Sequence, residues 1–338
     1  MRQLPGIAAD AVLRSLVADE VVNSNSIENV HSTRRQIEEA IQSFDGEDLK
    51  SKRFREFAKL YLNLVYGDYS VPEAPSGIRD IYDKVMSGEE LKDPPDGDLF
   101  RRGSVSIGDG TREIHRGMLP ESAIIQAMES MIRLVDDSDV PELYGALVSH
   151  FVFEYAHPFY DGNGRTGRYL LSMYLEAPLS KPTALSLSRI IAENKSQYYK
   201  AFETAENPLN HGEVTFFVMM MHELILMAQD QLIARLEQNI ETLALLGDKV
   251  GPLGQGKGLS EKELMVLFAL LQQRAFGMDG SISLGRLSSH IGVGAQMTRK
   301  YLAGLERQSF VKKTRGRSPL KFAITDHFLA EHGIELQP

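Results

Sequence analysis

The segment His157–Arg168, with the sequence HPFYDGNGRTGR, constrains the fold more than any other part of the chain. It lies between two runs in which apolar residues recur at helical spacing. Pro158 biases His157 away from helical backbone angles, so the first helix should end there. Gly162 and Gly164 permit a tight turn. We therefore predict a helix, a short loop, and a second helix that begins at or just after Gly164.

The same loop concentrates groups that handle phosphate. Backbone N–H groups of a glycine-rich turn, followed by a helix N-terminus, favour an anion. Arg165 and Arg168 share a face of the second helix and can each bind phosphate oxygens through two N–H groups. Asp161 is a single carboxylate beside this site, which is typical of Mg²⁺ held mainly by substrate phosphates. His157 is a base suited to neutral pH. The set fits attack by a hydroxyl group on a polyphosphate.

Two alternatives compete with this interpretation. The spacing Gly162-x-Gly164-x-x-Gly167 also fits the dinucleotide-binding fingerprint, but that motif requires a preceding strand and here a helix precedes it. A lone histidine is more often structural, and two arginines on a helix are more often a solvated face. The combination in twelve residues favours the phosphate site.

The segment resembles the signature of the Fic family, His-Pro-Phe-x-(Asp/Glu)-Gly-Asn-Gly-Arg-x-x-Arg, and matches it at every fixed position. The likeness extends over roughly residues 99–199. It implies a mostly α-helical fold: a Fic-type helical bundle with a short β-hairpin flap.

The resemblance also implies an activity, the transfer of AMP from ATP to a Ser, Thr or Tyr hydroxyl of a protein target. His157 would be the base, and Asp161 would ligate Mg²⁺. Asn163, with the backbone of Gly162 and Gly164, would hold the phosphates. Arg165 would bind the β-phosphate and Arg168 the γ-phosphate.

A hairpin is predicted before the motif, because Val105 and Ile107 alternate with polar residues before Gly-Asp-Gly, and Ile114 follows. In the Fic family this hairpin is a flap that pairs with the backbone of the target, and an exposed strand edge can accept a peptide strand. Here the flap would lie near residues 102–114. The alternative is a purely structural hairpin.

The segment SNSIEN, Ser24–Asn29, resembles the inhibitory helix of the Fic family, and its N-terminal position is that of the class II arrangement. Ser24 and Glu28 are four residues apart and would share a helix face. The resemblance implies that Glu28 pairs with Arg168 and so occupies the arginine that the γ-phosphate needs. The alternative is an ordinary surface helix.

Length and composition set the wider frame. The 338 residues predict two or three domains, 43% of them are hydrophobic and 25% charged, and there is no cysteine for a disulfide or a thiolate metal site. No apolar run is long enough and uninterrupted enough for a membrane span, so we expect a cytoplasmic protein without membrane contact. We predict an N-terminal helical region at 1–98, a catalytic core at 99–246, a Gly/Pro-rich linker at 247–258 and a third domain at 259–338.

The third domain resembles a winged helix-turn-helix. Residues 281–338 hold nine Lys or Arg against four Asp or Glu, whereas the rest of the chain holds 28 against 42. A basic module on an acidic body is typical of nucleic-acid contact. The predicted DNA contacts are Arg299, Lys300, Lys312, Lys313, Arg315 and Arg317. Protein contact by the same module is the alternative.

The sequence thus favours a Fic-type adenylyltransferase that uses ATP and Mg²⁺, with a protein target that could be the chain itself. Two alternatives remain: a DNA-binding regulator whose Fic domain senses nucleotide, and a Fic enzyme that transfers UMP or phosphate.

Overall fold

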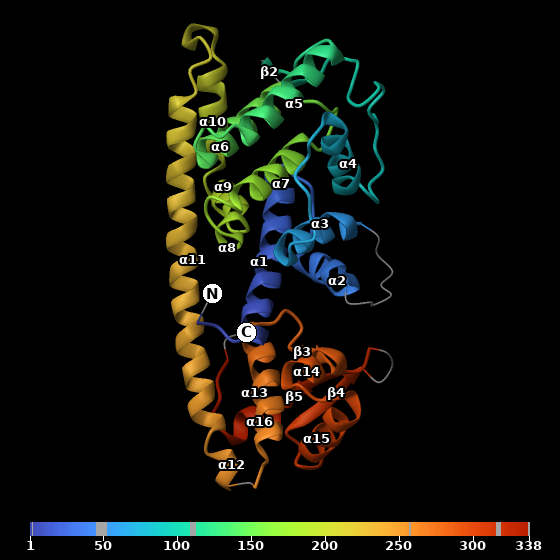
Figure 1. Cartoon of the computed structure of the whole chain (residues 1–338), viewed down its shortest axis with the longest axis vertical. Helices are drawn as coiled ribbons and strands as arrows, with labels where there is room; N and C mark the ends of the chain where they lie inside the picture. The colour runs from blue at the N-terminus through green and yellow to red at the C-terminus, as the bar shows by residue number, and fades with distance from the viewer. Residues whose placement is uncertain (2, 45–52, 109–112, 257, 316–318, 337–338) are drawn as a thin grey trace. The chain divides into compact units, whose positions relative to one another are not determined.

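The computed structural model describes residues 1, 3–44, 53–108, 113–256, 258–315 and 319–336. Helices dominate, as expected (Figure 1). The chain forms two compact units, one of residues 16–232 and one that combines residues 1–15 with residues 233–338. Two helices, α1 (Gly6–Ile27) and α11 (Thr215–Val250), contribute residues to both units.

The larger unit is a helical bundle with one two-stranded hairpin. Besides its shares of α1 and α11, its elements are α2 (Arg34–Phe44), α3 (Arg55–Tyr66), α4 (Pro75–Val85), β1 (Ser106–Gly108), β2 (Glu113–Arg116), α5 (Glu121–Asp136), α6 (Glu142–Ala156), α7 (Asn163–Leu175), α8 (Lys181–Ala184), α9 (Leu187–Glu193), α10 (Lys195–Glu206) and the 3₁₀ turn Pro208–Asn210. Helix α6 packs against both α5 and α7. Every residue of α7 is buried, so α7 is a central helix of the bundle.

The boundaries around the motif follow its residues. Helix α6 ends at Ala156, directly before His157 and Pro158, and α7 begins at Asn163, one residue earlier than expected. Gly162 has φ 79°, a left-handed conformation that glycine adopts without strain. The predicted helix, loop and helix are confirmed.

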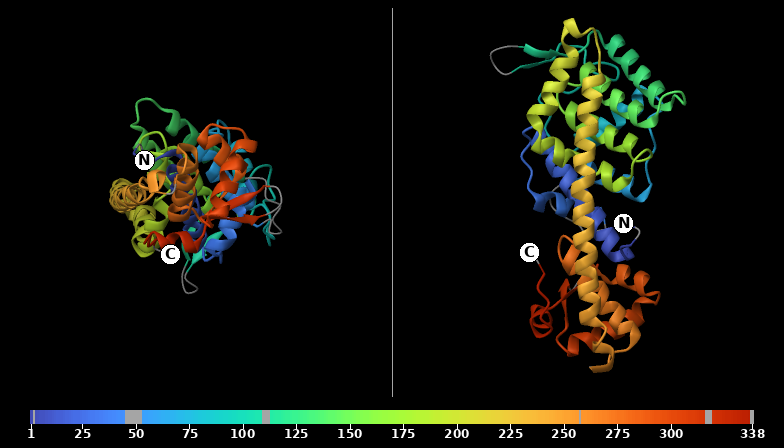
Figure 2. Two further views of the ribbon diagram at one scale, coloured as in Figure 1. Left: turned by 90° about the horizontal axis from the view of Figure 1, so that it is seen from below. Right: turned by 90° about the vertical axis from the view of Figure 1, so that its left-hand side faces the viewer.

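The hairpin is antiparallel, with Ser106 opposite Arg116 and Ile107 opposite His115. All three residues of β1 are exposed. Its strands lie at the surface of the larger unit (Figure 2). The predicted Asp-Gly turn falls within residues 109–112, outside the described residues.

The smaller unit contains α12 (Leu253–Gly256), α13 (Glu261–Phe276), β3 (Ser281–Ser283), α14 (Leu284–Ile291), α15 (Ala295–Arg307), β4 (Val311–Arg315), β5 (Lys321–Ile324) and α16 (Asp326–Glu331). Its antiparallel sheet has the strand order β3-β5-β4. Ser260 begins α13 with a reciprocal cap to Glu263. The succession of helix, strand, two helices and two strands agrees with a winged helix, which stays an interpretation.

The expected linker at 247–258 differs from what the structure contains. Helix α11 continues to Val250, and α12 follows at Leu253–Gly256. Leu246, Val250 and Leu253 recur at helical spacing and are buried in the core of the smaller unit. Burial of these side chains outweighs the low helix propensity of the glycines. The units also divide inside α1 and α11, instead of near residues 98 and 246.

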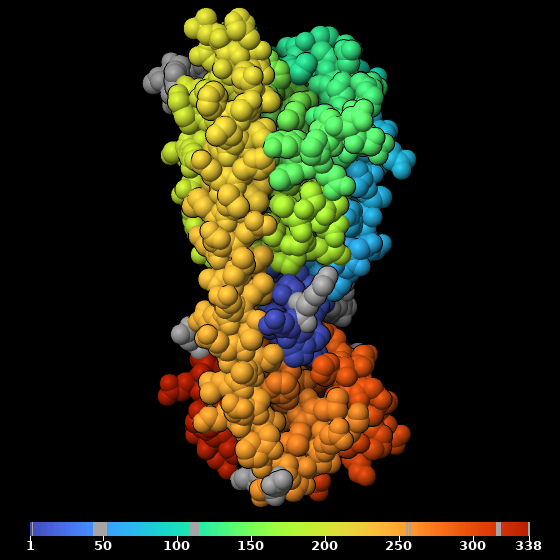
Figure 3. Space-filling view, turned by 60° about the vertical axis from the view of Figure 1, so that its left-hand side comes forward, coloured from blue at the N-terminus to red at the C-terminus, as the bar shows by residue number. Residues whose placement is uncertain are grey.

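Helix α11 is the one helix in the described part of the chain that is long and apolar enough to cross a membrane by length and composition. Core helices meet the same two conditions, and 44% of its most apolar 18-residue window is buried. Over the larger unit its outer side forms an exposed ridge (yellow in Figure 3), where Phe216, Met219 and Leu226 are more than half exposed.

Five of the six predicted DNA contacts lie on two elements of the smaller unit. Arg299 and Lys300 are exposed on α15, Lys312 and Lys313 are exposed on β4, and Arg315 ends β4. Lys312 lies 3.5 Å from the Asp326 carboxylate. Arg317 lies outside the described residues. Exposure alone does not identify a DNA surface, so these contacts remain a prediction.

Candidate active site

The loop between α6 and α7 is closed by its own side chains. Asn163 accepts a hydrogen bond from the Phe159 N–H at 2.9 Å and donates one to the Phe159 carbonyl at 2.7 Å. Its side chain is 2% exposed. The amide oxygen and the amide nitrogen of Asn163 are both bonded to the loop and fix its shape. The expected part of Asn163 in holding the phosphates stays a prediction.

His157 caps the C-terminus of α6 with φ 50° and ψ 62°, in the left-handed region. Its Nδ1 lies 3.3 Å from the carbonyl of Glu154. Because a carbonyl only accepts, Nδ1 carries the proton and Nε2 is left with a free lone pair. Burial, with a smaller contribution from His115, lowers the pKa of His157 to about 4. The imidazole is therefore neutral at physiological pH, the state that a general base requires.

A cavity of about 300 Å³ opens beside His157. Residues from four parts of the larger unit line it: the end of α1, the hairpin, the loop helices α6 and α7, and α10. They are Glu28, Ile107, Gly108, His115, Glu154, His157, Arg168, Tyr198, Tyr199, Phe202, Glu203 and Glu206. The volume and the mixture of aromatic and charged side chains are typical of a small-molecule site.

Arg168 is 2% exposed and directs its guanidinium at the end of α1. Its Nε donates to the Ser24 hydroxyl at 3.0 Å, its Nη2 to the Ser24 carbonyl at 2.9 Å, and its Nη1 to the Glu28 carboxylate at 2.9 Å. Burial is the largest single influence and opposes the charge, but Glu28 together with the other acidic groups nearby outweighs it and raises the pKa of Arg168 above its usual value. The pairing expected from the sequence is thus present.

Glu28 and Asn29 lie beyond the last residue of α1, Ile27, rather than on the helix itself. Asn29 has φ 56°, and its side-chain oxygen lies 3.4 Å from the Lys195 amine of α10. A Cβ added at Gly164 would collide with the Glu28 carboxylate. A glycine at this position therefore lets the carboxylate approach the N-terminus of α7.

Arg165 lies elsewhere. Its side chain is fully buried and pairs with Glu89 at 2.5 Å, while Nη2 lies 3.1 Å from the Met86 sulfur. It is not among the residues that line the cavity. Glu89 has no local sequence signal, because it lies 76 residues away in the turn after α4. The two guanidinium groups thus contact different carboxylates in this structure, and the expected contact of Arg165 with the β-phosphate stays a prediction.

Asp161 is exposed at the surface of the loop and accepts the Gly162 N–H at 2.7 Å. Its second oxygen has no hydrogen bond to the described residues. Among those residues, no group of three or more His, Cys, Asp or Glu could hold a metal ion. A single carboxylate binds Mg²⁺ well only where phosphates supply further ligands. Asp161 could therefore ligate Mg²⁺ together with a bound polyphosphate.

Three acidic residues of the cavity, Glu154, Glu203 and Glu206, were missed from the sequence. Glu154 is partly buried, its inaccessible Oε1 has no hydrogen-bond partner, and burial raises the pKa of Glu154 to about 8. Glu206 at the end of α10 lies 2.6 Å from His115 Nδ1 on β2, which joins the hairpin to α10. None of the three belongs to the motif, so only the fold places them near His157.

Comparison with known proteins gives matches to the Fic family. Residues 74–175 match the Fic/DOC family. A protein from Drosophila melanogaster named protein adenylyltransferase Fic is 25% identical over 183 residues, which are 52% of this chain and 35% of that protein. The protein of the same name from Drosophila mojavensis is 29% identical over 126 residues, 37% of this chain and 23% of that protein. The match thus covers well under half the length of these relatives.

A solved structure has a similar fold. The crystal structure of a Fic family protein from Desulfovibrio desulfuricans G20 superposes with a TM-score of 0.53 at 19% identity, and covers 93% of this chain and 87% of that one.

Proposed function

We propose that this chain, whose residues 74–175 match the Fic/DOC family, is a protein adenylyltransferase that moves AMP from ATP to a Ser, Thr or Tyr hydroxyl of a protein. The observation that carries the proposal is the pair formed by His157 and Arg168 on one cavity: a neutral imidazole with a free Nε2, and a buried guanidinium. A base and an anion-binding group on one cavity suit phosphoryl chemistry.

In this proposal Nε2 of His157 accepts the proton of the target hydroxyl. The hydroxyl oxygen then bonds to the α-phosphorus of ATP, and the bond to the bridging oxygen breaks, so that pyrophosphate leaves. The low pKa of His157 means that the imidazolium readily gives its proton up to water after each turnover. The Nδ1 contact with Glu154 holds the ring in the required tautomer.

The nucleotide would be held by the start of α7 and by Arg168. Backbone N–H groups at the N-terminus of α7 favour phosphate oxygens. Arg168 would take the terminal phosphate. Asp161 would hold Mg²⁺, which neutralises phosphate charge when bound. Arg165 has no direct phosphate contact in this proposal, because Glu89 and Met86 already occupy its two terminal nitrogens.

We also propose that Glu28 restrains the enzyme. ATP and Glu28 would compete for Arg168, since the same guanidinium group cannot bind the carboxylate and a phosphate fully at once. Three observations support this: the Glu28 contact at 2.9 Å, the two additional contacts from Ser24, and the close approach of Glu28 to Gly164. Glu28 keeps 29% of its side chain exposed, so it is able to leave.

The test uses purified protein, Glu28→Gly and His157→Ala, each incubated with Mg²⁺ and with ATP labelled at the α- or γ-phosphate, followed by intact mass. A label from the α-position that is strongest in Glu28→Gly and absent in His157→Ala supports adenylyl transfer. A label from the γ-position alone would establish phosphate transfer instead. UTP in place of ATP distinguishes UMP transfer. If no label is found even after cell lysate supplies targets, nucleotide sensing becomes the better assignment.

A further inference from the structure

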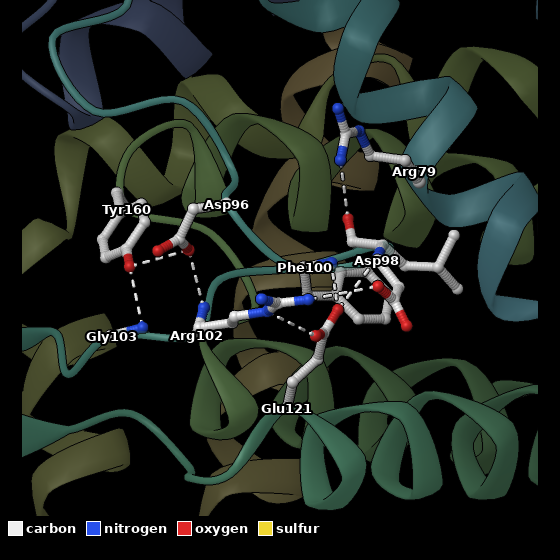
Figure 4. Close-up of polar contacts among 9 residues, drawn as sticks. Arg79, Asp96, Asp98, Phe100, Arg102, Gly103, Glu121 and Tyr160 are labelled. Carbon is white, nitrogen blue, oxygen red and sulfur yellow. Dashed lines mark hydrogen bonds and ion pairs between the residues drawn. The ribbon is translucent and has the colours of Figure 1, made fainter.

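The segment that leads into the hairpin is held firmly from its outer side (Figure 4). The Glu121 carboxylate, at the start of α5, accepts the backbone N–H groups of Leu99 and Phe100, both at 2.9 Å. These charge-assisted bonds fix the backbone direction before residue 101. The side chains that follow therefore have defined directions.

The motif loop itself holds the same segment. Tyr160 occupies the variable position of the motif, and its hydroxyl accepts the Gly103 N–H at 2.8 Å and donates to Asp96 at 2.9 Å (Figure 4). Asp96 in turn accepts the Arg102 N–H at 2.8 Å. The entry to the hairpin is thus tied to the loop that carries His157.

Arg101 points inward from this fixed backbone and is fully buried. Its guanidinium makes four hydrogen bonds, all to main-chain carbonyls. Nε donates to His157 at 2.8 Å, Nη1 to Gly103 at 2.6 Å, and Nη2 to Met118 at 3.0 Å and to Ala156 at 3.2 Å. Gly103 and Met118 flank the hairpin on either side. One side chain therefore joins the carbonyl of His157 to both ends of the hairpin.

The described residues include no carboxylate within ion-pair distance of Arg101. A buried guanidinium without a counter-charge is unfavourable, and burial lowers the pKa of Arg101. A Cβ at Gly117 would collide with this guanidinium, so the neighbouring backbone is shaped around it. A planar group with five donors spans several carbonyls at once, which a lysine amine does not. Arg101 therefore acts through the geometry of its guanidinium, which bonds several carbonyls at once, and not through an ion pair.

We propose that Arg101 is a positioning residue for His157, which clamps the backbone of the catalytic loop to the base of the hairpin. The clamp stabilises the left-handed backbone of His157, a conformation that is unfavourable for a residue other than glycine. It also fixes the separation between His157 and a target peptide paired with β1. The catalytic consequence rests on the proposed transfer of AMP; the clamp itself is independent of it.

The experiment compares Arg101→Ala and Arg101→Lys with Arg102→Ala, all in the Glu28→Gly background. Arg102 is the matched control, because the adjacent side chain is 63% exposed and contacts only the carboxylates of Asp98 and Glu121. Transfer to a target is followed with α-labelled ATP, and nucleotide affinity is measured separately.

We expect Arg101→Ala to reduce the transfer rate by on the order of 100-fold, with ATP affinity within about threefold of the parent, because misplacement of a catalytic group by about 1 Å has such an effect. Millimolar guanidinium ion, which fits the space left by the side chain, should restore about a tenth or more of the loss in Arg101→Ala and none in Arg102→Ala. Parallel losses of rate and ATP affinity, or a rate close to that of Arg102→Ala, would overturn the proposal.

Hydrogen exchange separates this proposal from the proposed function. In Arg101→Lys, amides of residues 104–108 and 113–118 should exchange at least about tenfold faster than in Arg102→Ala, while those of α6 and α7 stay unchanged. This readout holds whether or not AMP is transferred. Equal exchange in the two variants would show that the clamp does not exist, and faster exchange throughout the larger unit would show a merely structural role. If Arg101→Ala does not fold, Arg101→Lys carries both measurements.

Discussion

Arg165 and Arg168 lie three residues apart on α7, and both are buried against a carboxylate, yet their surroundings differ. Arg168 lines the cavity beside His157, and its partner Glu28 is 29% exposed. Arg165 lies away from that cavity, and its partner Glu89 is 13% exposed and accompanied by the Met86 sulfur.

In the proposed function, the difference separates an exchangeable ion pair from a lasting one. At Arg168 a phosphate would replace the carboxylate, because the cavity offers the space and Glu28 can regain water. At Arg165 a ligand of the two terminal nitrogens would have to displace Glu89 and Met86 and leave a largely buried carboxylate without its partner, which is strongly unfavourable. We therefore propose a binding role for Arg168 and a structural role for Arg165.

Loss of Arg168 should have the largest effect on catalysis. We expect Arg168→Met in the Glu28→Gly background to reduce AMP transfer by about 10²–10³-fold, because a charged group that contacts the reacting phosphates is removed. Transfer from α-labelled ATP measures this. Transfer of AMP at the parental rate in this variant would show that Arg168 does not bind the reacting phosphates.

Loss of Arg165 should mainly lower the stability of the folded protein. Arg165→Met leaves Glu89 without its partner, and we expect the free energy of unfolding to fall by about 3–5 kcal/mol. Urea unfolding checks this, with Glu28→Gln as the control, which should lose clearly less because its amide oxygen can still accept the hydrogen bond from Arg168. Adding Glu89→Met to Arg165→Met should recover part of the loss. Equal losses of stability in Arg165→Met and Glu28→Gln would mean that the two ion pairs contribute alike to the folded state.

Release of the exchangeable pair should activate the enzyme. A charge-assisted hydrogen bond contributes about 1.5–3 kcal/mol, so Glu28→Gly should raise the transfer rate at limiting ATP by about tenfold or more. Glu89→Gln is the matched control, since it neutralises the other carboxylate without opening the cavity. An equal rise of the transfer rate in Glu89→Gln would indicate that both arginines bind the nucleotide.

The smallest effect concerns pH and a second carboxyl group near Arg168, that of Glu154. Burial raises the pKa of Glu154 to about 8 in the folded protein, against an ordinary value of 4.5. The folded state therefore binds this proton more tightly than the unfolded chain does. The stability that this provides is fully present below pH 4.5 and is lost as the pH rises through about 8. Removing the carboxyl group in Glu154→Gln should weaken this dependence.

We expect the difference in melting temperature, Glu154→Gln minus the unsubstituted protein, to increase by a few degrees as the pH rises from 5 to 8.5. Thermal unfolding at several pH values measures it, and Glu203→Gln at the exposed rim of the same cavity is the control. A difference in melting temperature that stays constant across this range would mean that Glu154 contacts water and has an ordinary pKa in the folded protein.

Local features of the site could be read from the sequence, whereas distant partners could not. Pro158 and the two glycines fixed where α6 ends and α7 begins, because their backbone preferences act within a few residues. The contact of Glu28 with Arg168 joins positions 140 residues apart, and only a resemblance indicated it.

No comparable signal pointed to Glu89, Glu154 or Arg101. Each acquires its role from helices and loops that meet only in the folded bundle. The expected linker failed for a related reason: composition suggested flexibility, but burial of Leu246, Val250 and Leu253 decided the structure.

The contact between Glu28 and Arg168 lies within one chain, and this has a consequence for control. In the proposed restraint, Glu28 is an inhibitor tethered to its own target and present at a constant effective concentration, so lowering the protein concentration would not release it. Release of Arg168 would then be a first-order event whose rate is a property of the folded chain. A ligand or partner that favours the released state, or a change in the amount of ATP that competes for Arg168, would change the output.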